Sequence, residues 1–169
     1  IGPDKRGLVA KITDVITTRK ANIEESRMSR LGGEFAVLML LSVSQIVRDE
    51  LLIDLEKIIG EDVHIFIKET DLSRTKVFEG FIPYEISVIG ADHEGIVHAV
   101  AEYLAESRIQ VEEMETDVQP APVTGTPLFS MRAEVQAPPE LTLPKLREKL
   151  YVLGDKWGVD IEIRLPVRY

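Results

Sequence analysis

The chain carries one sequence pattern twice, with the two copies 88 positions apart. The stretch IGPDKRGLV at residues 1–9 returns as IGADHEGIV at residues 89–97, so that Gly2 aligns with Gly90. The similarity continues through an amphipathic stretch to NIEE at residues 22–25, which matches QVEE at residues 110–113. Self-similarity at a fixed period is typical of repeated structural modules. The sequence therefore predicts two copies of one small module.

Each repeated loop is followed by apolar residues at helical spacing. They are Leu8, Ile12, Val15 and Ile16 in the first copy and Ile96, Val100, Tyr103 and Leu104 in the second. This spacing places them on one face of a helix. Strand-like stretches at residues 23–31 and 34–43 then flank Gly32-Gly33, a pair suited to the positive φ angles of a hairpin turn.

The remaining segments complete a βαββαβ order in each copy. Residues 51–59 form a second helical pattern that Gly60 ends, and the alternating Val63, Ile65 and Ile67 predict a last strand. In the second copy a strand is expected at residues 84–89, before the repeated loop. Its hairpin opens into a loop rich in proline and glycine at residues 119–127, and a strand at 128–135, a helix at 143–157 and a strand at 161–165 follow.

The first copy has only Ile1 where the second copy has its opening strand. We infer that the first strand of the first module is missing from this sequence. We expect module 1 at residues 1–70, a polar linker at 71–81 and module 2 at 82–169. Two helices joining four antiparallel strands in this order predict an α+β fold, in which each module is a ferredoxin-like sandwich.

Composition excludes several functional classes. The net charge of −9 argues against direct binding of nucleic acid, which needs a positive surface. The longest apolar run, residues 35–41, is far shorter than the roughly 20 residues of a membrane span. With no cysteine in the chain, we expect no disulfide and no thiolate metal site. No secretory leader is visible, and we expect a cytoplasmic protein.

The strand at residues 35–41 is apolar at every position, which indicates burial on both of its sides. We expect sheets to pair, either between the two copies or between two chains, so a homo-oligomer such as a dimer is predicted. A central strand that simply exposes a few apolar residues is the alternative.

The repeated loop is the candidate site. Asp4 and Asp92 are placed to cap the helix that follows, by accepting a hydrogen bond from a free backbone N–H. Gly7 and Gly95 disfavour the first helical turn, by about 1 kcal/mol relative to alanine, and yet both copies keep them. Something is therefore expected to approach the backbone closely. A small anion bound at the helix start and a tightly packed neighbouring strand explain the glycines equally well.

The pattern Gly-x-Asp-x-x-Gly-[Leu/Ile]-Val between a strand and a helix, with Asn-Ile-Glu opening the next strand, resembles the ACT domain, an amino-acid-sensing module. Both copies match it. Together with Ser26-Arg27-Met28 and Gly33-Glu34-Phe35, the pair is similar to the tandem-ACT family of glycine cleavage system transcriptional repressors. That resemblance implies a regulatory protein with no catalytic domain, which responds to a small amino acid and acts on a partner protein.

The resemblance also implies where the ligand binds. The amino acid would lie at an interface between ACT modules, with its carboxylate at the loop and helix start and its amine near the opening of the second strand. The corresponding positions are Gly2, Asp4, Gly7, Leu8, Asn22 and Ile23 in the first copy, and Gly90, Asp92, Gly95, Ile96, Gln110 and Val111 in the second. Gln110 and His93 depart from the family pattern, so the first copy is the stronger candidate.

No catalytic constellation is expected. The doublets Glu24-Glu25 and Glu112-Glu113 point to opposite faces of their strands, and the histidines are not spaced as metal ligands. An acylphosphatase-like hydrolase would need an arginine in the loop, and Arg6 is matched by Glu94 in the second copy. The prediction is a non-enzymatic regulator of the glycine or serine class, without a cofactor or a metal. The alternative is a scaffold that mediates protein association and binds no ligand.

Overall fold

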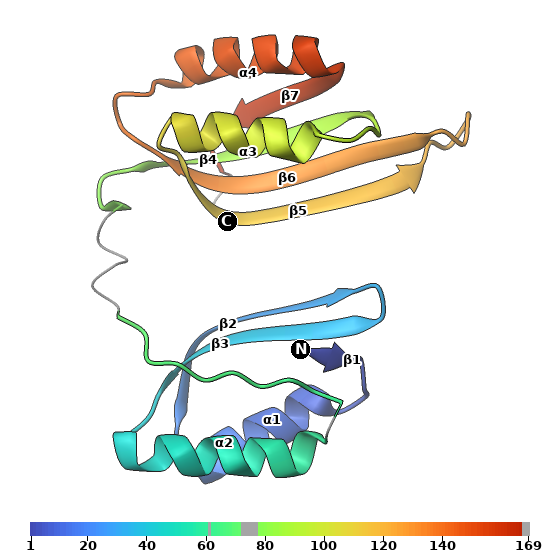
Figure 1. The fold of residues 1–169 in the computed structure, drawn as a ribbon. Helices are drawn as coiled ribbons and strands as arrows, with labels where there is room; N and C mark the ends of the chain where they lie inside the picture. Colours follow the sequence, from blue (N-terminus) through green and yellow to red (C-terminus); the bar gives the residue numbers. More distant parts are fainter. Residues whose placement is uncertain (61, 72–77, 167–169) are drawn as a thin grey trace. The chain divides into compact units, whose positions relative to one another are not determined.

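A computed structural model describes residues 1–60, 62–71 and 78–166. The chain divides into two compact units, Ile1–Thr70 and Asp71–Tyr169. In each unit, helices cover one face of an antiparallel sheet (Figure 1). Of the expected linker, residues 72–77 lie outside the described residues. The α+β, ferredoxin-like fold predicted from the repeat is confirmed.

Unit 2 has a four-stranded sheet with strand order β5-β6-β4-β7. Helices α3 and α4 lie on one face of this sheet (Figure 1). The core between them is closed, because Ile86, Val88 and Leu150 are each 0% exposed. The elements are β4 (Ile82–Ala91), α3 (Ile96–Glu106), β5 (Gln110–Pro120), β6 (Pro127–Ala137), α4 (Leu143–Trp157) and β7 (Val159–Arg164).

Unit 1 has a three-stranded sheet with strand order β1-β3-β2. Its elements are β1 (Gly2–Pro3), α1 (Leu8–Thr18), β2 (Asn22–Leu31), β3 (Glu34–Ser42) and α2 (Gln45–Ile59). The predicted hairpin is confirmed, because Gly32 and Gly33 join β2 to β3 with φ angles of 58° and 93°. The apolar face predicted for α1 is also confirmed, since Leu8, Ile12, Val15 and Ile16 are all buried.

The last strand predicted for the first copy is not formed. Val63, Ile65 and Ile67 do alternate with exposed residues and pack against the core of unit 1, but no strand is assigned within residues 62–71. A strand here needs a hydrogen-bonded neighbour, and β1 spans only two residues. Next to β1, His64 pairs with Ile1 through two hydrogen bonds, because His64 N donates to Ile1 O at 2.8 Å and His64 O accepts from Ile1 N at 2.9 Å. The apolar alternation was therefore read correctly, but the pairing that would make it a strand is incomplete.

The hairpin of unit 2 is longer than predicted. Its ladder runs on to the pair Pro120 and Pro127, which lies inside the stretch expected to be a loop. The connection is therefore shorter than residues 119–127. The pairing continues one step beyond these prolines, because Ala121 N donates to Thr126 O at 2.8 Å.

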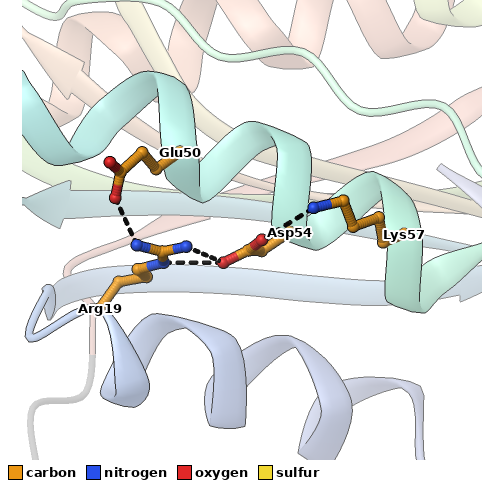
Figure 2. A network of polar contacts seen from close by, with 4 residues as sticks. All are labelled: Arg19, Glu50, Asp54 and Lys57. Atoms are coloured by element: carbon orange, nitrogen blue, oxygen red, sulfur yellow. Dashed lines mark hydrogen bonds and ion pairs between the residues drawn. The ribbon is translucent and has the colours of Figure 1, made fainter.

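An ionic network ties α1 to α2 in unit 1 (Figure 2). Arg19, which follows α1, donates from Nε to Oδ2 of Asp54 at 2.7 Å and also reaches Glu50. Lys57 Nζ lies 3.6 Å from the other Asp54 oxygen. The hydrogen bond from Arg19 holds the pKa of the Asp54 carboxyl below its ordinary value. Ser107 takes the equivalent position after α3, so the two copies differ in how their helices are joined.

The sheet face turned away from the helices is apolar along β3. Phe35, Val37 and Met39 pack toward the helices, whereas Leu38 points to the opposite side and is 74% exposed. The expected apolar residues on both sides of this strand are thus present. Pairing of that face with another sheet stays a prediction.

The equivalent face of unit 2 is charged. Glu85 on β4 is only 5% exposed, because Arg132 and Arg164 lie over it from the neighbouring strands. Arg132 donates to Glu85 Oε2 at 2.7 Å, and Arg164 Nε donates to Oε1 at 2.8 Å. Burial disfavours the charge on Glu85, but the two arginines outweigh it and hold its pKa below the ordinary value. The two copies therefore present faces of different chemistry.

Candidate functional site

A glycine in the left-handed conformation opens the first helix of each unit. Gly7 is the N-cap of α1 with a φ of 80°, and Gly95 is the N-cap of α3 with a φ of 96°. A residue with a Cβ atom is disfavoured in this region by about 1–2 kcal/mol. Glycine is therefore required by the backbone path from the loop into the helix, which explains its presence in both copies. The sequence interpretation placed these glycines inside the first turn, so it began each helix one position too early.

The aspartates of the loop do not cap the helices, which corrects the sequence interpretation. No side chain makes a capping hydrogen bond to α1 or α3. Asp4 instead forms an ion pair with Arg30 on β2, with 3.2 Å between Oδ2 and Nε. Its backbone N–H donates to Gly33 O at 3.0 Å, and Asp92 donates in the same way to Pro127 O. Each aspartate thus extends the strand pairing, three positions before the actual N-cap.

The amides at the start of α1 are consequently open. A helix leaves its first N–H groups without partners inside the helix. In the described part of the chain, no hydrogen bond engages the N–H of Val9 or Ala10, and both residues are exposed. A Cβ placed on Gly7 would meet no atom within 4 Å. The helix start in unit 1 therefore offers free donors and open space beside them.

The start of α3 in unit 2 is partly covered. A Cβ placed on Gly95 would lie 2.9 Å from the ring of Trp157, the last residue of α4. His93 stacks on that ring with 5.8 Å between centroids, and its Nε2 lies 2.8 Å from Trp157 O. Its Nδ1 lies 3.2 Å from Glu94 O. These backbone carbonyls, Trp157 first, raise the pKa of His93, because only the protonated ring can donate to both.

The loops also differ in charge. Asp4 is followed by Lys5 and Arg6 in unit 1, whereas Asp92 is followed by His93 and Glu94 in unit 2. Lys5 forms a 3.0 Å ion pair with Asp62, and Arg6 is exposed. A carboxylate arriving at the helix start meets a basic loop in unit 1 and an acidic one in unit 2.

The close approach predicted at Gly7 and Gly95 is present at Gly95, where the Trp157 ring lies, and absent at Gly7. It also occurs at a second pair of glycines, for which it was not predicted. A Cβ on Gly2 would lie 2.8 Å from Val63, and one on Gly90 would lie 2.6 Å from Val159. Both glycines sit in the strand before the loop, where the closing segment of each unit crosses. The packing explanation therefore applies to Gly2 and Gly90, and the conformational one to Gly7.

Asn22 and Gln110 are the polar residues predicted at the opening of the second strand, and neither lies beside the repeated loop of its own unit. Asn22 opens β2 opposite Ser42, and both side chains donate to Glu24 Oε1, at 3.0 and 2.6 Å. These hydrogen bonds, that of Ser42 above all, lower the pKa of Glu24. In unit 2 Gln110 donates to the carbonyl of Val111. Ile23 and Val111 pack against their own cores.

Within one unit, the two halves of the predicted site are far apart. Leu8 begins α1 and Asn22 follows its other end, and at about 1.5 Å per residue the 11 residues of α1 separate them by roughly 16 Å. The same holds for Ile96 and Gln110 at the ends of α3. A small amino acid cannot touch both. A ligand that contacts both kinds of position must take one half of its site from a second module.

The sequence analysis did not predict two residues that contact the repeated loops, Arg30 and Trp157. Arg30 reaches Asp4 only because the hairpin folds β2 and β3 beside the loop. Trp157 reaches Gly95 from the far end of α4. The available signal for Trp157 was its place as the sole tryptophan of the chain, at the end of a helix that returns toward the loop.

Comparisons with known proteins agree with this fold. A family model described as the ACT domain matches residues 1–65. A UPF0237 protein of Methanococcus maripaludis is 38% identical over 69 residues, which cover 40% of this chain and 76% of that protein. A protein of unknown function from Galdieria sulphuraria has a solved structure that is 30% identical, with a TM-score of 0.79 over 98% of this chain and 94% of the other. The family model thus identifies residues 1–65 as an ACT domain.

A more distant likeness extends over both units. The solved structure of a proposed glycine cleavage system transcriptional repressor is 20% identical, with a TM-score of 0.63, over 99% of this chain and 94% of that one. At this identity the likeness concerns the fold alone. In the described ranges, no helix has the length and apolar character needed to cross a bilayer. Nor do three histidine or acidic side chains gather there as metal ligands would.

Proposed function

We propose that this protein is a non-enzymatic regulator that binds a small amino acid, of the glycine or serine class, and thereby changes its affinity for a partner protein. The observation that carries the proposal is the open start of α1. Free N–H groups at Val9 and Ala10 and the positive end of the helix dipole suit a carboxylate.

The basic loop of unit 1 favours the same ligand group. Arg6 is exposed beside the helix start, and Lys5 adds positive charge. Unit 2 has Glu94 at the position of Arg6 and the ring of Trp157 against Gly95. The first copy is therefore the binding copy in this proposal, and the second has mainly a structural role.

The remaining contacts of the ligand come from a second ACT module. The ammonium group would meet polar side chains at the opening of a β2-type strand, such as Asn22 and Glu24. The hydrogen bonds that Glu24 accepts lower its pKa and so favour its charged form. A ligand that contacts two modules can change how these modules pack against each other. It can shift that packing only by the difference of its affinities for the two arrangements.

The regulated process in this proposal is transcription of genes for amino-acid metabolism, through the partner protein. The tandem-ACT likeness to a proposed glycine cleavage system transcriptional repressor supports that direction. The net charge of −9 supports action through a protein partner rather than direct contact with DNA.

Isothermal titration with the common amino acids tests the proposal. At ligand concentrations reaching several times about 1 mM, which corresponds to a binding free energy near −4 kcal/mol, glycine or serine is expected to release or take up heat. Silence from every amino acid would remove the sensor proposal.

A matched pair of variants locates the site. Arg6→Glu gives unit 1 the charge that unit 2 has, and is expected to weaken binding. Lys145→Glu makes the same charge change on exposed α4 of unit 2 and is expected to leave binding unchanged. Equal effects of the two variants would mean that net charge, and not the helix start of unit 1, governs the affinity.

An association scaffold without a ligand is the second candidate. The exposed Leu38 on the open face of β3 favours it, because an apolar side chain at that place suits a protein contact. Thermal shift separates the two functions, since a ligand that binds only the folded state raises the melting temperature. A scaffold would show no shift with any amino acid.

A further inference from the structure

The repeated loop of each unit is bonded to the chain near the end of the second helix of that unit, but through different side chains. In unit 1, Lys5 Nζ lies 3.0 Å from Oδ2 of Asp62, which follows shortly after the Gly60 that ends α2. In unit 2, His93 takes the position of Lys5, and its Nε2 lies 2.8 Å from the carbonyl oxygen of Trp157, the last residue of α4. The two copies therefore hold the loop at the same place with side chains of different chemistry.

The contacts of His93 require a protonated ring. Its Nε2 faces Trp157 O, and its Nδ1 lies 3.2 Å from Glu94 O. Carbonyl oxygens only accept hydrogen bonds, and a neutral imidazole has a single N–H to donate. A neutral His93 can therefore keep only one of its two bonds. Because His93 is exposed, its ring exchanges protons freely with solvent.

The end of α4 favours the charged ring. The carbonyl of Trp157 is among the last carbonyls of the helix, which have no partner inside it. The same end of the helix carries partial negative charge, which stabilises a nearby cation. A protonated His93 thus caps α4 at its carboxyl end.

Other ionisable groups lie on the elements around His93. Asp92, on the same loop, attracts the protonated ring. The others are Glu94 on the loop, His98 in the first turn of α3, Asp155 and Lys156 in the last turn of α4, and Asp160 on β7. Of these, only His98 is of a type that ordinarily changes its charge near neutral pH. It is therefore the group to control for in any pH experiment on this loop.

We propose that His93 is a pH-dependent latch on the repeated loop of unit 2. When it is protonated, it bonds the loop to the end of α4 and keeps the Trp157 ring over the start of α3. When it is neutral, it gives up one of its two bonds and its attraction to the end of the helix, so that the loop is released and the start of α3 is uncovered. The latch belongs to unit 2 and does not depend on amino-acid binding in unit 1.

The cover that the latch controls lies at Gly95. The Trp157 ring would be 2.9 Å from a Cβ placed on Gly95, and it stacks on His93 with 10° between the ring planes. His93 thus contacts Trp157 twice, through the ring and through the carbonyl. Release of the loop therefore changes the surroundings of the indole directly.

The first copy shows how the same contact is made without a pH response. A lysine ammonium keeps its charge across the neutral range, whereas an imidazole titrates within it. The ion pair of Lys5 with Asp62 is built from side-chain types that both stay charged there. Replacement of the lysine by His93 gives unit 2 a contact that can respond to pH.

The test follows the fluorescence of Trp157, the only tryptophan in the chain, between about pH 5.5 and about pH 8.5 in the full chain. The emission and its quenching by acrylamide are expected to follow one titration with a midpoint above pH 6.5. Quenching should be stronger on the alkaline side, where the ring is uncovered. Each pH unit above the midpoint should lower the ratio of latched to released loop about tenfold. The far-ultraviolet circular dichroism should stay constant over the same range.

Two substitutions at His93 separate the effect of charge from that of pH. His93→Lys supplies the permanent charge found in unit 1 and is expected to abolish the titration, with quenching held at its acidic level. His93→Gln removes the charge and should hold quenching at its alkaline level. His98→Gln is the matched control in the first turn of α3 and should leave the titration unchanged.

Three results would overturn the latch. The first is a titration that persists in both His93 variants or is lost in His98→Gln. The second is the absence of any titration of Trp157 in the unaltered chain. The third is a circular dichroism change in step with the emission, because unit 2 would then unfold and not merely release its loop.

Discussion

Replacing Gly95 with alanine tests the contact that distinguishes the two helix starts. The new methyl group would lie 2.9 Å from the Trp157 ring, which is closer than packed carbon atoms tolerate. Alanine also has to adopt a φ near 96°, which costs about 1–2 kcal/mol. Gly7→Ala is the matched variant, because it imposes the same backbone cost at a φ of 80° with open space around it.

The difference between the two variants follows from what holds Trp157. Its ring stacks on His93, and its carbonyl accepts a hydrogen bond from the His93 ring. Displacing the ring disturbs both. The backbone cost and the overpacking against the ring together are expected to make Gly95→Ala lower the free energy of unfolding of its unit by about 2–4 kcal/mol. Gly7→Ala should lower that of unit 1 by about 1–2 kcal/mol.

Urea unfolding followed by tryptophan fluorescence reads unit 2 alone, because Trp157 is the only tryptophan in the chain. Gly95→Ala should shift this transition to lower urea and alter the emission of the folded state. Gly7→Ala should change only the far-ultraviolet circular dichroism transition. Trp157→Leu, which removes the fluorescent reporter, should relieve the extra cost of Gly95→Ala in the far-ultraviolet circular dichroism transition. Equal costs at the two glycines, or a cost that persists without the indole, would refute the steric argument.

Three further predictions concern charge and exposure. The pKa of His93 is raised in the folded state, so its hydrogen bonds stabilise unit 2 fully below the ordinary pKa of 6.5 and lose this effect as the pH rises through the folded-state pKa. The melting temperature of unit 2 should therefore fall between about pH 5.5 and about pH 8. This fall should be smaller in the His93→Gln variant. Replacing both Arg132 and Arg164 with alanine should lower the free energy of unfolding of unit 2 in urea by more than the two single replacements added together. The reason is that Glu85 keeps one arginine partner in each single variant. An additive result would contradict this pairing. Leu38→Glu should change the unfolding free energy by less than about 0.5 kcal/mol, since the side chain is 74% exposed, yet reduce self-association in sedimentation if oligomers form through β3.

The pH prediction for Glu85 has the opposite sign to that for His93. Its pKa is lower in the folded state, so its pairing stabilises unit 2 above the unfolded pKa and is lost as the pH falls through the folded one. The cost of losing the pair is moderate for a 5% exposed carboxylate, about 1–3 kcal/mol. The reason is that its cover consists of two arginine side chains that are themselves about 60% exposed, so water lies one layer away.

The sequence by itself determined the architecture of this protein. Repetition at a fixed period identified two modules, and helical spacing at Leu8–Thr18 and the Gly32-Gly33 pair identified elements that the structure confirms. These signals are local, because the period of apolar residues and the conformational freedom of glycine act within a few residues of the chain. The same local signals suggested a last strand at Val63–Ile67, and there they were insufficient.

Only the tertiary structure decided which neighbours these local elements meet. A strand requires a partner, so the alternation at Val63–Ile67 stays largely unpaired beside a two-residue β1. Asp4 could cap a helix, but the folded hairpin brings Arg30 to it first. Trp157 covers Gly95 from 62 positions further along the chain, while Gly7 stays open. Contacts between distant segments depend on the packing of whole elements, and a repeat in sequence therefore does not ensure a repeat in the site.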